Sequence, residues 1–171
     1  WDIIDDFNIN YTLVRNSERI EIAVSPANND AVYILTGNTH TTLDECSNSV
    51  DYFNGYYVSL DNGSSFVRFD NTVVNLNSNC CNGSDYRQQS KYDIALAVNN
   101  IAPQIIIAGG IITWRSINFG FNWSPAYVDD DPNGQCSDTG IEGFIHGDIH
   151  QLAYQPISNR LWACTDGGVY Y

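Results

Sequence analysis

The 171-residue sequence contains no methionine, and it has only seven lysine and arginine residues against twenty aspartate and glutamate residues. The resulting net charge of −13 repels phosphate backbones and anionic lipid surfaces, which argues against a nucleic-acid partner. No stretch approaches the roughly 18 consecutive apolar residues of a membrane span, and the start at Trp1 lacks the layout of a signal peptide. Because methionine is absent, we expect a processed chain or an excerpt of a longer one.

A sustained hydrophobic period of 3.6 residues, typical of amphipathic helices, is also missing. Aromatic residues make up 13% of the chain, and short apolar runs alternate with clusters of Asn, Gly and Ser. This pattern predicts an all-β domain, and a chain of this length can bury a sizeable core.

Two octets, residues 59–66 and 116–123, share one pattern of Ser, Asp or Asn, Gly and an aromatic residue at fixed offsets. The matching residues are Ser59, Asp61, Gly63, Phe66, Ser116, Asn118, Gly120 and Trp123. The spacing predicts a tight turn between two strands. In such a turn the Asp or Asn side chain bonds to turn amides, Gly supplies a positive φ, and the aromatic residue packs into the core.

A unit of strand, Asn-containing turn and strand recurs over residues 19–36, 94–108 and 151–163. If Ala23, Ala97 and Ala153 are equivalent, Val32, Ile106 and Trp162 follow at one common offset. Each full repeat then combines this unit with a strand, an octet turn and a last strand. A repeated four-stranded antiparallel meander predicts the blades of a β-propeller.

The expected organisation is a single β-propeller segment over residues 1–171. It comprises an outer strand of a preceding blade (1–18), two blades with octets (19–70 and 92–127) and the first half of a further blade (148–171). A propeller closes with about 4 to 8 blades. We therefore expect the remaining blades in the same polypeptide or in a neighbouring chain.

The octets resemble the Asp-box, or bacterial neuraminidase repeat, of sialidases, xyloglucanase-like glycosidases and sortilin-type luminal domains, although the second octet carries Asn118 in place of Asp. Three further segments, Tyr92 to Val98, His146 to Tyr154 and Thr165 to Tyr170, are similar to segments of secreted propellers of this type. The resemblance implies an Asp-box β-propeller that is secreted or displayed on a cell surface. It does not imply an activity, because propellers host unrelated functions.

In such a propeller the short turns share one face, and the long connections over residues 38–53, 70–91 and 128–147 share the other. Long polar loops on a rigid scaffold commonly carry binding residues. We therefore expect a glycan or protein ligand at the long-loop face, with His40 and Asp93 among the candidate residues. Tolerated insertions are the competing interpretation.

Four of the five cysteines lie in these connections: Cys46, Cys80, Cys81 and Cys136. They predict two disulfides of undetermined connectivity and hence an oxidising, extracellular compartment. A zinc site is the alternative, but no Cys-x-x-Cys spacing supports it. Cys164 lies in an expected strand, where we expect a buried free thiol.

His146, Asp148 and His150 alternate at the start of an expected strand, so their side chains would project from one face. They could bind a divalent transition metal or act as acid and base groups. The structural alternative is a hydrogen-bonded polar cluster. Asp93 and Asp166 are candidate partners, although Asp166 is expected to cap the turn of its Asp-Gly-Gly segment.

Asp129, Asp131 and Asn133 belong to an oxygen-rich loop that could bind calcium, with a solvated acidic loop as the alternative. Two further functions compete with the binding module. A glycoside hydrolase similar to the xyloglucanase-like propellers would need two carboxylates about 5 to 10 Å apart, and no such pair can be assigned. A structural or adhesive assembly subunit would have its partial blades completed by neighbours.

Overall fold

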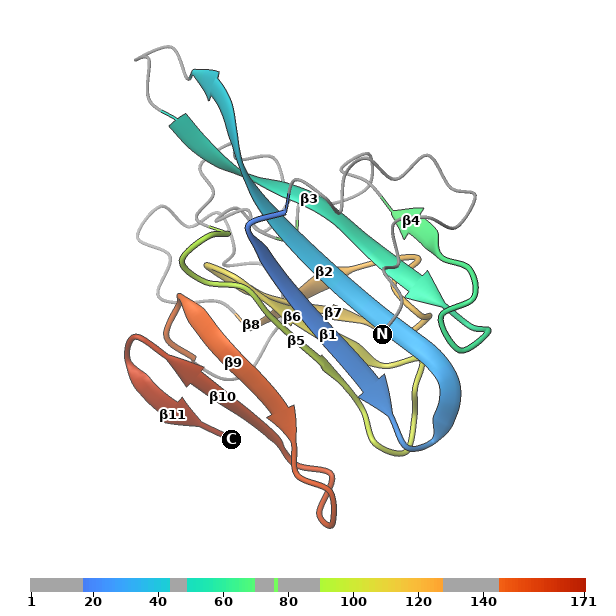
Figure 1. Ribbon diagram of the computed structural model, residues 1–171. Coiled ribbons are helices and arrows are strands. Elements are labelled where there is room, and N and C mark those ends of the chain that lie inside the picture. The colour runs from blue at the N-terminus through green and yellow to red at the C-terminus, as the bar shows by residue number, and fades with distance from the viewer. Residues whose placement is uncertain (1–16, 44–48, 70–75, 77–89, 128–144) are drawn as a thin grey trace.

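The computed structural model describes residues 17–43, 49–69, 76, 90–127 and 145–171. Within these ranges the chain forms eleven strands and no helix, so no helix there is long and apolar enough to cross a membrane. The strands build two four-stranded sheets and one three-stranded sheet, all antiparallel (Figure 1). The prediction of an all-β chain with four-stranded antiparallel repeats is confirmed.

Each sheet is a meander in which neighbouring strands follow one another along the chain. The first sheet contains β1 (Arg19–Ser25), β2 (Asn28–Leu43), β3 (Ser49–Ser59) and β4 (Val67–Phe69). The second contains β5 (Ala95–Val98), β6 (Ile106–Gly109), β7 (Thr113–Ser116) and β8 (Ser124–Tyr127). The third contains β9 (Ile149–Tyr154), β10 (Leu161–Thr165) and β11 (Gly168–Tyr170).

The hairpin of β2 and β3 is longer than the sequence predicts. The prediction of a loop over residues 38–53 is wrong, because backbone pairing continues from Asn38 opposite Tyr52 to Leu43 opposite Ser49. The polar composition of this segment is what predicts a loop. Its threonines are nevertheless β-branched, and β-branched residues favour strands.

The first strands of the three sheets lie next to each other. β1 contacts β5, and β5 contacts β9, so the second sheet packs between the other two (Figure 1). β5 is buried along its whole length. Burial on both faces explains why its sequence is an unbroken run of small and aliphatic residues rather than an alternation of apolar and polar ones.

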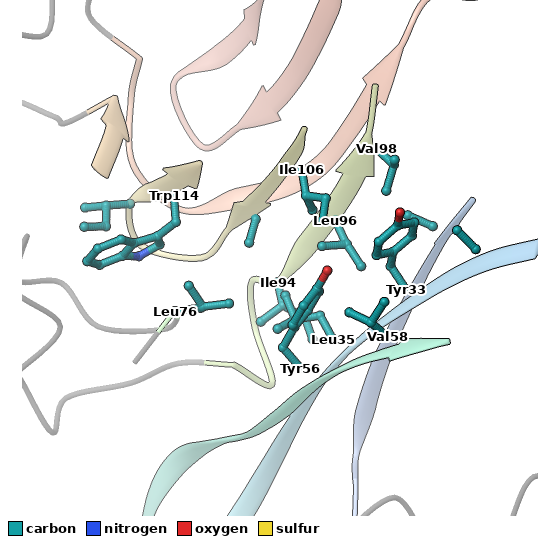
Figure 2. Close-up of a cluster of buried hydrophobic side chains, with 14 residues drawn as sticks. Tyr33, Leu35, Tyr56, Val58, Leu76, Ile94, Leu96, Val98, Ile106 and Trp114 are labelled. Atoms are coloured by element: carbon teal, nitrogen blue, oxygen red, sulfur yellow. The ribbon is translucent and has the colours of Figure 1, made fainter. Parts of the chain in front are cut away.

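The larger core cluster joins the first and second sheets (Figure 2). Its largest side chains include Tyr33, Leu35 and Tyr56 from the first sheet and Ile106 and Trp114 from the second, none of them more than 1% exposed. Burying an aliphatic or aromatic side chain of this size stabilises a fold by about 2 kcal/mol. These residues therefore provide much of the hydrophobic stabilisation between the two sheets.

A smaller cluster joins the second and third sheets. Ala95, Ala97 and Ile107 of the second sheet pack with Ile149 and Leu152 of the third. The backbone also connects the two sheets, because the Ile149 amide donates a hydrogen bond to the Gly110 carbonyl oxygen (2.8 Å). The third sheet is thus held against the second by apolar contacts and by main-chain hydrogen bonds.

The register of the third sheet differs by one residue from that of the other two. The backbone pairs are Ala23 with Tyr33, Ala97 with Ile107, and Ala153 with Trp162. The predicted common offset is therefore wrong for the third sheet, because Trp162 takes the position of Tyr33 and Ile107 and not that of Val32 and Ile106. The three alanines themselves remain comparable: Ala23 and Ala97 pack against the next sheet along the chain, and Ala153 is exposed on the outer face of the third sheet, opposite to Leu152, which packs on the second. A change of one residue in a hairpin connection exchanges the two faces of a strand.

The first octet forms the predicted turn between β3 and β4. The Ser59 hydroxyl accepts a hydrogen bond from the Gly63 amide (2.8 Å) and donates one to the Asp61 carboxylate (2.7 Å). Asp61 also accepts hydrogen bonds from the Ser65 hydroxyl (2.6 Å) and amide (2.8 Å). These bonds, chiefly those from Ser65, lower the Asp61 pKa to about 2. Gly63 has the predicted positive φ (82°), and Phe66 is buried.

The second octet forms the same turn with an asparagine. Asn118 Oδ1 accepts hydrogen bonds from the Ser116 hydroxyl (3.0 Å) and the Asn122 amide (2.9 Å). The Gly120 amide donates to the Ser116 hydroxyl oxygen (2.8 Å), and Gly120 has a φ of 89°. Trp123 packs against the larger core cluster. Exchanging Asp for Asn therefore preserves the turn and removes its charge.

Phe119 holds a left-handed backbone conformation with a φ of 61°, as Asn62 does at the matching position of the first octet (59°). Asn tolerates the left-handed region, whereas this conformation costs other L-residues about 1–2 kcal/mol. The Phe119 side chain packs against the larger core cluster, and its carbonyl oxygen accepts a hydrogen bond from the Tyr56 hydroxyl (3.3 Å). These contacts with the core and the first sheet offset the strain.

Candidate functional site

The strand ends form two opposite edges of the stacked sheets, and these edges differ in the connections that they carry. The word edge is used here for such a row of strand ends and not for an edge strand. One edge, here the connection edge, is where β5 and β9 begin and where β4 and β8 end. The connections that follow Phe69 and Tyr127 in the sequence therefore leave from this edge. The other edge, here the turn edge, carries both octets. The strand ends that flank the long connections and the two short octet turns thus lie at opposite edges.

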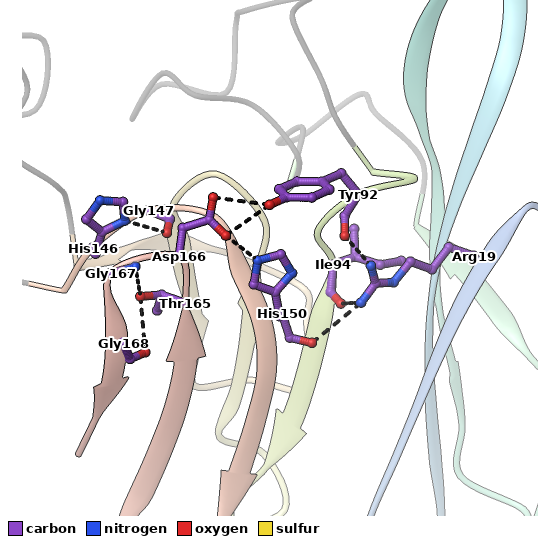
Figure 3. A network of polar contacts seen from close by, with 10 residues as sticks. All are labelled: Arg19, Tyr92, Ile94, His146, Gly147, His150, Thr165, Asp166, Gly167 and Gly168. Carbon is purple, nitrogen blue, oxygen red and sulfur yellow. Dashed lines mark hydrogen bonds and ion pairs between the residues drawn. The ribbon is translucent and has the colours of Figure 1, made fainter.

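A cluster of Tyr92, His150 and Asp166 lies at the connection edge (Figure 3). His150 Nε2 is 2.6 Å from Asp166 Oδ1, and the Tyr92 hydroxyl donates to both Asp166 carboxylate oxygens (3.0 and 3.1 Å). The rings of Tyr92 and His150 meet edge to face, with centroids 5.0 Å apart. Because Tyr92 precedes β5 while His150 lies on β9, the cluster bridges the second and third sheets.

Arg19, the first residue of β1, connects the first sheet to this cluster through main-chain oxygens. Its guanidinium donates to the carbonyl oxygens of Tyr92, Ile94 (3.0 Å) and His150 (3.5 Å) (Figure 3). A planar guanidinium with five donors suits several acceptors at once. Arg19 also pairs with Glu21 (3.4 Å). All three sheets therefore meet at one cluster.

The contacts set the protonation states of the cluster. The hydrogen bond from His150, followed by that from Tyr92, lowers the pKa of Asp166. The hydrogen bond to Asp166 in turn raises the pKa of Tyr92. At neutral pH the cluster thus presents an ionised acceptor and a neutral phenol. Tyr92 is 52% exposed, and the side chains of His150 and Asp166 are 33% and 39% exposed, so a ligand can reach all three.

His146, Asp148 and His150 do not alternate on one strand as the sequence predicts. β9 begins at Ile149, and Asp148 has a positive φ of 59°, so the premise of a common face fails. His146 Nδ1 is 3.0 Å from the carbonyl oxygen of neighbouring Gly147. In the part of the chain that the structure describes, no three His, Cys, Asp or Glu side chains are grouped to hold a metal ion.

The other predicted residues are placed as follows. Asp93 is 1% exposed, and both Asp93 and Asp148 raise the Tyr92 pKa through their charge, so they lie near the cluster. His40 lies in β2 opposite Val50, and its side chain is outside the described part. Cys164 is a free thiol, but it is partly rather than fully buried. The predicted sites outside the described residues are Cys46, Cys80, Cys81, Cys136, Asp129, Asp131 and Asn133.

Thr165, and not Asp166, caps the turn between β10 and β11. The Thr165 hydroxyl accepts a hydrogen bond from the Gly167 amide (3.1 Å) and donates one to the Gly168 carbonyl oxygen (3.3 Å). Asp166 is thereby available for Tyr92 and His150. Tyr92 is a site residue that the sequence alone does not single out. Its position directly before an apolar strand was the available signal.

The chain matches no protein-family model, and a search of curated proteins gives no significant match. The chemistry of the cluster is therefore the main guide to function. An ionised carboxylate, an imidazole and an exposed phenol ring can accept and donate hydrogen bonds beside a flat apolar surface. Such a combination suits ligands with hydroxyl groups.

Replacing His150 by glutamine should raise the Asp166 pKa toward the ordinary value of about 3.9, since the hydrogen bond from His150 is the largest cause of its shift. Tyr92→Phe should raise the Asp166 pKa by a smaller amount, because the hydrogen bond from Tyr92 is the second cause of the shift. Because the folded-state pKa is lowered, the ionised carboxylate stabilises the fold at pH values above its unfolded pKa. This contribution disappears as the pH falls through the folded-state pKa.

A carbon-detected NMR titration of the Asp166 carboxyl group measures this change, and the Asp61 carboxyl group is the internal control. The Asp61 pKa should stay near 2 in both variants. An Asp166 pKa that is the same in the wild type and both variants would contradict the cluster.

Proposed function

We propose that the chain is a segment of an Asp-box β-propeller that binds a ligand at the connection edge. Two four-stranded meanders and a three-stranded one, stacked with their first strands adjacent, support the architecture. Each of the first two meanders has an octet turn between its third and fourth strands. Propeller blades bury their faces against one another in the same way.

Exposed apolar side chains on both outer faces of the stack support the presence of further blades. On the first sheet, Ile22 and Val24 are 61% and 63% exposed. On the third sheet, Trp162, Val169 and Tyr171 are 40%, 65% and 76% exposed. Exposed apolar patches commonly mark contacts with another protein surface. In a propeller, neighbouring blades of the same polypeptide or of another chain would cover them.

The cluster of Tyr92, His150 and Asp166 is the observation that carries the binding proposal. The preferred ligand is a neutral glycan, because sugar hydroxyls can bond to Asp166 and His150 while a sugar face stacks on Tyr92. The net charge of −13 disfavours an anionic glycan. A protein segment with hydroxyl or amide side chains is the alternative ligand for this edge.

A secreted or cell-surface location belongs to the same proposal. It is supported by the resemblance to secreted propellers and by the four cysteines of the connections, which suit an oxidising compartment. Calcium or another divalent metal bound near Asp129, Asp131 and Asn133 stays a hypothesis.

A glycoside hydrolase fits the cluster less well. Such an enzyme needs one carboxylic acid with a raised pKa to protonate the leaving group. The Asp166 pKa is lowered instead, so Asp166 suits the role of a hydrogen-bond acceptor and not that of the acid. The assembly subunit differs from the binding module in needing no ligand at the connection edge.

A glycan array probed with the labelled chain tests the function. We expect binding to neutral glycans, and Tyr92→Ala should weaken this binding about fivefold or more, because aromatic contacts contribute about 1 kcal/mol beyond the area they bury. Tyr171→Ala is the matched control, since Tyr171 is also an exposed tyrosine but lies on the outer face of the third sheet. Equal binding by the Tyr92 variant and the wild type would contradict the proposal.

A further inference from the structure

A pocket of about 190 Å³ lies at the turn edge, away from the Tyr92 cluster. Its apolar wall is formed by Val58, Leu60, Val67, Phe69, Phe119 and Phe121. The first four residues belong to the first sheet and its octet, and the two others belong to the second octet. The pocket therefore forms only where the turns of two neighbouring sheets meet.

The rim of the pocket is unusually apolar for an exposed surface. Leu60, Val67 and Phe121 are 55%, 59% and 56% exposed although each borders the pocket. Phe69 and Phe121 meet edge to face with ring centroids 5.1 Å apart, which fixes one wall. Engineered apolar cavities of about 150 Å³ hold a benzene molecule. The pocket therefore has room for one aromatic ring or one branched aliphatic side chain.

One charge lies beside this apolar surface. Asp61 lines the pocket together with Ser65, and its hydrogen bonds keep it ionised over the physiological pH range. The matching residue of the second octet is the neutral Asn118. A group that fills the pocket would therefore meet the negative charge of Asp61, in a chain whose net charge is −13. Charge complementarity favours a cationic neighbour to the apolar group.

The strained conformation of Phe119 supports a role for this site. The matching position of the first octet holds Asn62, which tolerates the left-handed conformation. Phenylalanine at this position brings an aromatic side chain to the wall of the pocket. Strained residues that the surrounding structure holds in place are concentrated at binding sites.

We propose that the turn edge carries a second binding site, which takes a peptide segment with a bulky apolar side chain next to a basic one. The apolar side chain fills the pocket between the two octets, and the basic side chain lies against Asp61. The partner is therefore a protein with an exposed aromatic-basic sequence. This site is separate from the ligand proposed for the connection edge.

The test uses two dipeptide probes, N-acetyl-Phe-Arg-amide and N-acetyl-Phe-Glu-amide, titrated into the ¹⁵N-labelled chain. We expect saturable shift changes of the amide signals of residues 60–67 and 119–121 with the first probe. The second probe should bind about two- to fivefold more weakly, as expected for one exposed charge pair. The same titration leaves the signals of Tyr92 and His150 unchanged.

Two variants separate the contributions. Asp61→Asn should abolish the preference for the basic probe while the turn persists, because Asn118 supports the same turn in the second octet. Leu60→Ala should weaken binding about threefold or more through lost apolar contact. Ile117→Ala is the matched control, because Ile117 occupies the same octet position and is 64% exposed but does not line the pocket.

The outcomes are decisive in both directions. Saturable binding that prefers the basic probe, and that Leu60→Ala weakens while Ile117→Ala does not, supports the site. The absence of saturable shifts in the wild type overturns it, as does equal affinity for the two probes. Equal effects of Leu60→Ala and Ile117→Ala would likewise overturn it, because binding would then not involve the pocket.

Discussion

Gly120→Ala should lower the free energy of unfolding by about 3 kcal/mol or more. Gly120 has a φ of 89°, which strains any L-residue, and an added Cβ would lie 2.1 Å from Tyr56 Cε1. The Tyr56 ring cannot move away easily, because it is 1% exposed and packs edge to face on Trp123 with centroids 5.2 Å apart. Overpacking a well-filled core adds about 1–3 kcal/mol to the cost of the backbone strain.

Gly63→Ala is the matched control, because Gly63 holds the same position in the first octet. Its φ is 82°, but an added Cβ would have no heavy atom within 4 Å. This variant should lose only about 1–2 kcal/mol, from backbone strain alone. Urea denaturation followed by tryptophan fluorescence measures both values. If Gly120→Ala costs no more than Gly63→Ala, the second octet does not pack against Tyr56 of the first sheet.

Ile149→Ala should also lower the free energy of unfolding by about 3 kcal/mol. Ile149 is 1% exposed and packs so closely on β6 that a Cβ added to Gly109 would lie 2.7 Å from its own Cβ. Removing this side chain leaves a cavity between the second and third sheets. The neighbouring backbone hydrogen bond from Ile149 to Gly110 should then open more often, which hydrogen exchange of the Ile149 amide detects.

Ile157→Ala gives the control for this variant. Ile157 lies in the connection between β9 and β10 and is 93% exposed, so its replacement should change stability by no more than about 0.5 kcal/mol. Similar small effects of both variants would contradict the packing of the third sheet against the second.

The strands and octet turns could be predicted because their signals are local. Asp61 and Asn118 bind turn amides within their own octets, and Gly63 and Gly120 have positive φ values that the turn itself requires. The apolar run of β5 depends only on the burial of both faces of this strand. Such patterns are present in a single sequence without knowledge of the rest of the fold.

The cluster at the connection edge could be predicted only in part, because it depends on how the sheets pack. The sequence identifies His150 as part of a metal site, an acid–base pair or a hydrogen-bonded polar cluster, and Asp166 as a candidate partner or a turn cap, without showing which of these holds. Their contact arises because Asp148 adopts a positive φ before β9 and Thr165 takes over the turn. Arg19 and Tyr92 join from other sheets, and no spacing along the chain indicates that.

The loop predicted over residues 38–53 and the register of the third sheet failed for different physical reasons. In the segment predicted as a loop, the polar composition favours a loop, but the β-branched residues of the segment favour strands and extend β2 and β3. In the third sheet, the connection after Tyr154 is one residue shorter than its counterparts, so that Trp162 and not Ala163 lies opposite Ala153. Hairpin register depends on turn geometry, which composition alone does not specify.

We propose that Tyr92, His150 and Asp166 form the binding site of the connection edge. The most direct test of this proposal is an NMR titration of the labelled chain with the neutral glycan that binds best on the array, observing the ring signals of Tyr92 and His150. The proposal predicts saturable shifts of both rings at the affinity seen on the array, with the signals of Tyr171 unchanged. Saturable binding that leaves the signals of Tyr92 and His150 in place would contradict it.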